Sequence, residues 1–170
     1  MNSTHKSTIG FFLILFAVLY FGFDTKPSDH GLIEKSRALK MSTTDVSILK
    51  REAQNTLSNA QKGKVEILNA QLNSAPDTLE RVRFLKELSG AWYEFGFPSI
   101  AGSYAEDIAT IENSDEAWGI TGTTYALGIG NSKSEKEGKF CKEKALSAFD
   151  IAISLNSKEL RHQVNKAVTL

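Results

Sequence analysis

From Val46 onward, apolar residues recur every three or four positions, and this spacing restricts the fold more than any other feature of the chain. In an α-helix such residues share one face, whereas a half-buried strand requires alternation at every second residue. No stretch of the sequence alternates in that way. Prolines break helices, and the 170 residues contain only three, Pro27, Pro76 and Pro98. The predicted fold class is therefore all-α.

The first apolar stripe lies between residues 45 and 76 and predicts a helical spacer. Gly63 interrupts the stripe and is expected to divide it into two helices. Its apolar positions are Val46, Leu49, Ala53, Leu57, Ala60, Val65, Leu68 and Leu72.

Further helix starts are expected where a capping residue precedes an acid by three positions. The cap side chain accepts a hydrogen bond from an unpaired amide of the first turn, and the acid reaches back to the cap. The pairs are Asn113 with Glu116, Ser134 with Glu137, and Asn156 with Glu159. Similarly, Ser74 is expected to cap a helix opened by Pro76, and Pro98 to open the next. The result is a series of antiparallel helices joined by short turns.

One spacing is more specific than the helical period. The residues Trp118-x2-Thr121-Gly122-x2-Tyr125 follow the first-helix pattern of a tetratricopeptide repeat, W-x2-L-G-x2-Y, and Ala145-x3-Phe149 follows its second helix. Small residues are expected where neighbouring helices approach most closely. Gly122 and Ala145 occupy two such positions, and the repeat register places Ala167 at a third.

The sequence departs from this pattern in three places. Thr121 stands where leucine is usual, no proline follows the second helix, and the spacing from Tyr125 to Ala145 is longer than in a standard repeat. The extra residues are assigned to a polar surface insertion from Gly128 to Lys139, with 128–131 read as a loop.

From about Arg81 to its end the chain resembles the tetratricopeptide-repeat superfamily, and its overall layout resembles bacterial membrane-anchored repeat proteins. The resemblance implies helix pairs stacked into an α-solenoid whose concave face holds a peptide or a partner helix. The last repeat is incomplete at Leu170, so the sequence is interpreted as part of a longer chain. Repeat arrays need a capping helix, and therefore Val164, Ala167, Val168 and Leu170 are expected to be poorly buried.

The segment from Ile9 to Phe23 is apolar and contains no charged residue. A helix of that length is about 22 Å long, shorter than the hydrocarbon core of about 30 Å. Because no small-x-small cleavage pattern closes it, an uncleaved transmembrane anchor is the preferred interpretation. A cleaved signal peptide and a buried core helix remain alternatives.

The charges that flank this segment weakly favour a cytoplasmic N-terminus. The predicted localisation is thus a single-pass membrane protein whose helical body lies on the extracytoplasmic (periplasmic) side. The predicted organisation is a tail at 1–8, a transmembrane anchor at 9–23, a linker at 24–44, a helical spacer at 45–76 and tetratricopeptide-like repeats at 77–170.

Composition and motifs argue against several classes of function. Lys+Arg and Asp+Glu are both 20, so no excess of positive charge predicts nucleic acid as a partner. His5, His30 and His162 do not form a metal-binding spacing, and no phosphate loop is present. The single cysteine, Cys141, lies near a predicted helix start, where its pKa could be lowered, but no histidine is nearby in the sequence. No catalytic residue, metal or cofactor is predicted.

The favoured function is a non-catalytic, membrane-tethered scaffold that binds a protein or peptide partner. Its predicted contact residues are Glu116, Thr123 and Asn165, on the first helices of the repeats. One alternative is a structural membrane protein that self-associates into a homo-oligomer through the stripe at 46–72. An enzyme without a recognisable motif is the least favoured.

Overall fold

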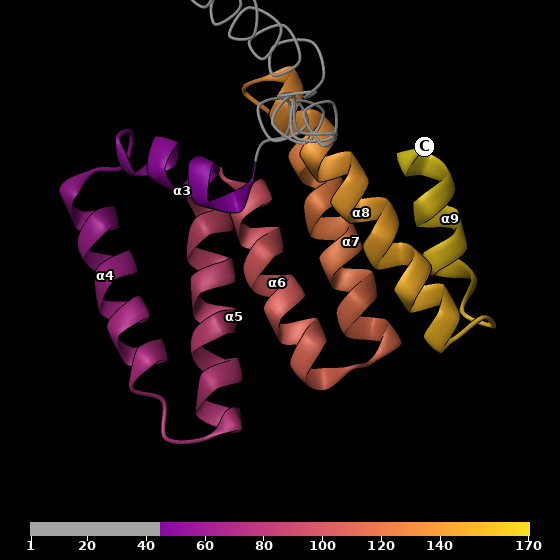
Figure 1. Ribbon diagram of the computed structural model, residues 1–170, viewed down its shortest axis with the longest axis horizontal. Coiled ribbons are helices and arrows are strands. Elements are labelled where there is room, and N and C mark those ends of the chain that lie inside the picture. The colour runs from indigo at the N-terminus through magenta and orange to yellow at the C-terminus, as the bar shows by residue number, and fades with distance from the viewer. Residues whose placement is uncertain (1–44) are drawn as a thin grey trace, which may run out of the picture. The chain divides into compact units, whose positions relative to one another are not determined.

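A computed structural model describes residues 45–170 of this chain (Figure 1). Hydrogen bonds to capping side chains mark where most of its helices begin. Side chains of Asp45, Ser58, Asp77, Ser114 and Ser134 each accept an amide hydrogen bond in the first turn of a helix. The described residues contain no strand, so the all-α class is confirmed. The helices are α3 (Val46–Gln54), α4 (Asn59–Asn73), α5 (Thr78–Glu94), α6 (Pro98–Glu112), α7 (Asp115–Gly130), α8 (Glu135–Leu155) and α9 (Leu160–Thr169).

Two predicted helix starts are confirmed and the others are displaced by one to three residues. Ser134 caps α8, and Pro98 is the first residue of α6. The other predicted caps, Ser74, Asn113 and Asn156, instead end the preceding helices. The turns are so short that the residue that ends one helix lies only one to three positions before the cap of the next, and the sequence pattern did not separate the two.

The predicted break at Gly63 is also wrong, because this residue lies inside α4. The chain breaks earlier, between Gln54 and Asn59, where Ser58 and Gln61 form a capping box. The reciprocal bonds of that box satisfy two helix-start amides and fix the new helix at this point.

The predicted loop at 128–131 and the insertion at 128–139 are corrected in the same way. Helix α7 continues to Gly130 and α8 already begins at Glu135, so the extra residues lengthen both helices. A Cβ at Gly128 would lie 2.7 Å from the Cys141 sulfur, which shows how closely the two helices approach there. That packing outweighs the low helix propensity of glycine.

Helices that follow one another in the chain pack side by side as antiparallel neighbours from α4 to α9 (Figure 1). Helix α3 also contacts α6. The apolar stripe of the predicted spacer is used inside this stack: Leu49, Leu57, Val65 and Leu68 are buried in one core with α5 and α6. The stripe at 46–72 is therefore mostly covered by the chain itself, although Ala60 is exposed.

Two of the three small residues of the repeat pattern lie at helix contacts. A Cβ on Gly122 would lie 2.6 Å from Cε1 of Phe149, and Ala145 is fully buried. Ala167 is exposed, so its predicted role at a helix contact is wrong. Helix α9 buries only His162. The expected poor burial of Val164, Ala167, Val168 and Leu170 is confirmed.

The membrane-spanning part of the predicted fold class requires correction. Among residues 45–170, no helix combines the length and the apolar character needed to cross a bilayer. The predicted anchor at 9–23 lies outside the residues that the structure describes, as do the tail and the linker. The transmembrane helix is accordingly withdrawn from the fold class, and so is the single-pass, extracytoplasmic localisation.

The close contact at Gly122 predicts opposite effects for one methyl group added at two helical glycines. Gly122→Ala is expected to lower the free energy of unfolding by about 1–3 kcal/mol, because the methyl group meets the Phe149 ring. At Gly90, in α5, an added Cβ meets nothing within 4 Å. Gly90→Ala is therefore expected to raise the free energy of unfolding by about 0.5–1 kcal/mol, because alanine loses less backbone freedom than glycine when the helix forms. Denaturant unfolding monitored by circular dichroism measures both changes. Equal shifts in the two variants would contradict the assigned contact.

Candidate functional site

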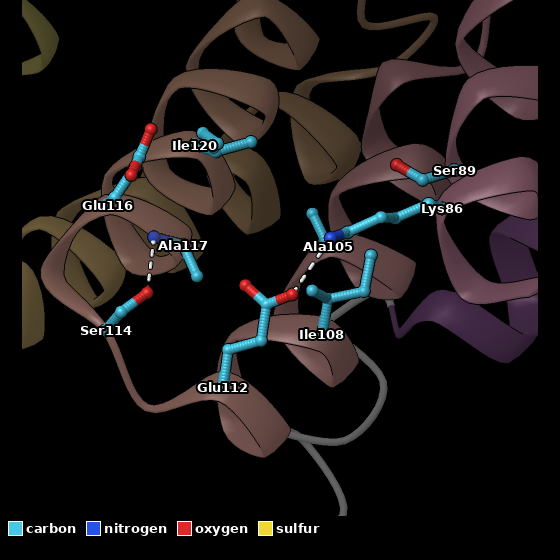
Figure 2. A pocket seen from close by; sticks show the side chains of 9 residues that line it. All are labelled: Lys86, Ser89, Ala105, Ile108, Glu112, Ser114, Glu116, Ala117 and Ile120. Carbon is cyan, nitrogen blue, oxygen red and sulfur yellow. Dashed lines mark hydrogen bonds and ion pairs between the residues drawn. The ribbon is translucent and has the colours of Figure 1, made fainter. Parts of the chain in front are cut away.

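Two hollows meet on the exposed face of α7. The first is bordered by α5, α6 and α7 (Figure 2). Its apolar side chains come from α6 and α7, and its polar groups come from all three helices. It is lined by Lys86, Ser89, Ala105, Ile108, Glu112, Ser114, Glu116, Ala117 and Ile120.

The second hollow lies on the other side of the same face, between α7 and α9. It is lined by Glu116, Gly119, Ile120, Thr123, Thr124, Arg161, His162 and Asn165. Glu116 and Ile120 line both hollows, so the two adjoin on α7, and we call them together the α7 groove. The groove links the alternate helices α5, α7 and α9.

All three predicted contact residues line this groove. Glu116 and Thr123 come from α7 and Asn165 from α9, and the second hollow brings them together. Their role in binding remains a prediction. Sequence reasoning missed Ile120, which is 56 % exposed at the centre of the groove. It lies four residues after Glu116 and three before Thr123, and this helical spacing places all three on one face.

The opposite face of α7 explains why this one is turned outward. Thr121 and Tyr125 are buried, and they lie four residues apart on this face. Thr121, which replaces the usual leucine, donates a hydrogen bond from Oγ1 to the carbonyl oxygen of Ala117 at 2.9 Å. Its buried hydroxyl is thus satisfied, and the threonine is compatible with the packed interface.

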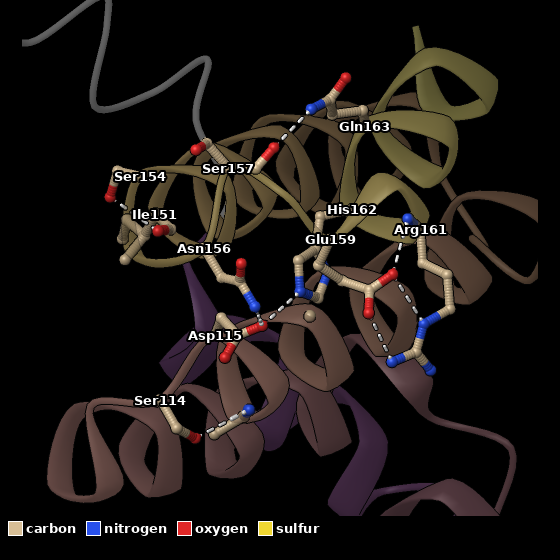
Figure 3. Close-up of polar contacts among 12 residues, drawn as sticks. Ser114, Asp115, Ile151, Ser154, Asn156, Ser157, Glu159, Arg161, His162 and Gln163 are labelled. Carbon is tan, nitrogen blue, oxygen red and sulfur yellow. Dashed lines mark hydrogen bonds and ion pairs between the residues drawn. The ribbon is translucent and has the colours of Figure 1, made fainter.

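The far wall of the groove is fixed by polar contacts between the start of α7 and the start of α9 (Figure 3). Asp115 Oδ2 lies 3.1 Å from Nε2 of His162 and accepts a hydrogen bond from Nδ2 of Asn156 at 3.0 Å. The hydrogen bonds from His162 and Asn156 hold the pKa of Asp115 below its ordinary value. A Cβ on Gly119 would lie 2.5 Å from the His162 ring, so the absent side chain allows the imidazole to rest on α7.

The described residues offer little for covalent or metal chemistry. No group of three metal-ligating side chains occurs among residues 45–170. Cys141 is fully buried, and burial together with the charge of Glu137 raises the pKa of its thiol to about 12. The expectation that a helix start could lower this pKa is therefore wrong. A thiol that stays protonated at neutral pH is a poor nucleophile.

Comparison with known proteins adds no assignment: no family model, curated protein or solved structure matches this chain.

The contacts of Asp115 predict how firmly α9 is attached. Asp115→Ala removes the partner of a buried histidine and is expected to speed amide hydrogen exchange throughout α9, with little change in α5 and α6. Asp150→Ala is the matched control. It also removes a contact to α9, the ion pair between Asp150 and Lys166, but the Asp150 side chain is 58 % exposed, and exposed ion pairs contribute little to stability. Hydrogen exchange read by mass spectrometry compares the two. Equal effects of both variants would show that the Asp115 contacts do not hold the helix.

Proposed function

We propose that this chain is a non-catalytic protein–protein interaction scaffold of the tetratricopeptide-repeat type, and that the α7 groove receives an extended or helical segment of a partner protein. The observation that carries the proposal is that two hollows, one toward α5 and one toward α9, adjoin on α7 and share an exposed isoleucine, Ile120. A groove of this form follows several helices, as a peptide would, whereas a small-molecule site is usually a more enclosed pocket.

The repeat assignment is supported by the packing of its motif residues. Tyr125, Ala145 and Phe149 are buried together in one cluster, and Gly122 lies directly against the Phe149 ring. Such contacts are what the repeat motif implies for residues at these positions. In stacked helix pairs, alternate helices share one face of the array, and the α7 groove lies on such a set.

Burial of Ile120 by a partner would stabilise the complex. Burying an exposed isoleucine side chain against an apolar partner contributes about 1–2 kcal/mol, and apolar positions near the centre of an interface commonly dominate its affinity. The surrounding threonines, together with Asn165, supply the polar rim that accompanies such a centre.

The alternative of self-association through the stripe at 46–72 is not favoured. Its principal side chains, among them Leu49, Leu57 and Leu68, already pack in the core with α5 and α6. Exposing them to another chain would require the stack to open, and the free energy of that core would be lost.

The proposal is tested by selecting a random peptide library on the full chain and measuring the affinity of enriched peptides by fluorescence anisotropy. Ile120→Asp is expected to weaken binding by about tenfold or more, because a charge replaces the apolar centre. Ile67→Asp is the matched control: this isoleucine is 61 % exposed in α4 and lies outside the groove. Circular dichroism verifies that both variants stay helical. Failure to enrich any peptide, or an equal loss in both variants, would refute the proposal.

A further inference from the structure

The charged side chains of the α7 groove differ in whether they form ion pairs within the chain. Lys86 Nζ lies 2.9 Å from Oε1 of Glu112, and this ion pair spans α5 and α6 at the edge of the first hollow. The guanidinium of Arg161 donates two hydrogen bonds to the carboxylate of Glu159, each at 3.1 Å. Both cations of the groove are therefore already neutralised by a neighbouring acid.

Glu116 is the exception. Its carboxylate forms no hydrogen bond or ion pair with any residue in 45–170, and the residue is exposed on the surface shared by the two hollows. Arg161 is near enough to feel its charge, but Arg161 interacts first with Glu159. The two hollows thus share one carboxylate that forms no direct ion pair with the residues in 45–170.

This charge lies one helical turn from the apolar centre. Ile120 follows Glu116 by four residues, so the two side chains are neighbours on the helix surface, about 6 Å apart at their Cβ atoms. Figure 2 shows both on the same exposed side of α7. On the opposite wall, the side-chain amide of Asn165 has no hydrogen-bond partner among the described residues and remains able to pair with a peptide backbone.

From this arrangement we infer that the partner segment is basic and apolar: it places a lysine or arginine against Glu116 beside an aliphatic side chain on Ile120. The inference rests on the proposed function and specifies the partner of the same groove. An acidic segment is disfavoured, because it would face Glu116 directly and find both groove cations occupied by Glu112 and Glu159. The formal net charge of the chain is zero, so a preference for basic peptides would come from the groove and not from overall attraction.

The experiment uses the full chain and short synthetic peptides of equal length that share one leucine and differ at a single neighbouring position, which is lysine, glutamine or glutamate. At low ionic strength the lysine peptide is expected to bind at least about fivefold more tightly than the glutamate peptide. Glu116→Gln should abolish this preference and Glu116→Lys should reverse it. Glu135→Lys, at an exposed first-turn glutamate of α8 outside the groove, should leave it unchanged.

The outcomes separate this inference from the function on which it rests. If peptides bind and Ile120→Asp weakens them, but their charge has no effect or the acidic peptide binds best, the inference is overturned and the scaffold proposal stands. The same holds if the preference for lysine survives in Glu116→Gln. If no peptide of any charge binds, both are overturned. The remaining alternative is that a second copy of the chain occupies the groove, and size-exclusion chromatography of the free chain tests it. Self-association that Ile120→Asp abolishes would show that a second copy fills the groove and would overturn the inference.

Discussion

The close approach of α7 to its neighbours is the contact on which the rest of the structure depends. Helix α7 carries glycines where α8 and α9 press against it, and the missing side chains leave room for Phe149, Cys141 and the His162 ring. Gly102 of α6 likewise makes room for Tyr125. Because the glycines of α7 face its neighbours, Glu116, Ile120 and Thr123 remain exposed on the outer face, where they line the groove.

Polar contacts then determine where the groove ends. His162 is the one buried residue of α9, and it is held by Asp115 at the start of α7. The wall formed by Arg161 and Asn165 therefore depends on a hydrogen-bonded junction more than on apolar packing. Such a junction orients a short helix even though the helix buries little apolar surface, and Val164 and Val168 accordingly remain exposed.

The sequence predicted that the chain is all-α, most of its apolar core positions and the packing role of Gly122 and Ala145, but its predicted transmembrane helix is not among the described helices. It misplaced several helix boundaries, because Asn113 and Asn156 suit a helix end as well as a helix start, and only tertiary contacts decide between the two. It also read 128–131 as a loop, since the contact of Gly128 with Cys141 joins residues distant in the chain. For the site, three groove residues were identified from the repeat register, but Ile120 was missed because apolar residues were assigned to the core.

The central claim, that the α7 groove is the binding surface, is tested most directly by nuclear magnetic resonance of the labelled chain titrated with a selected peptide. The account predicts that the largest amide shift changes fall on groove residues of α5, α7 and α9, with Glu116, Ile120 and Asn165 among them, while α4 stays unchanged. Changes concentrated on α4 or on the outer surface of α8, with α7 unaffected, would contradict it.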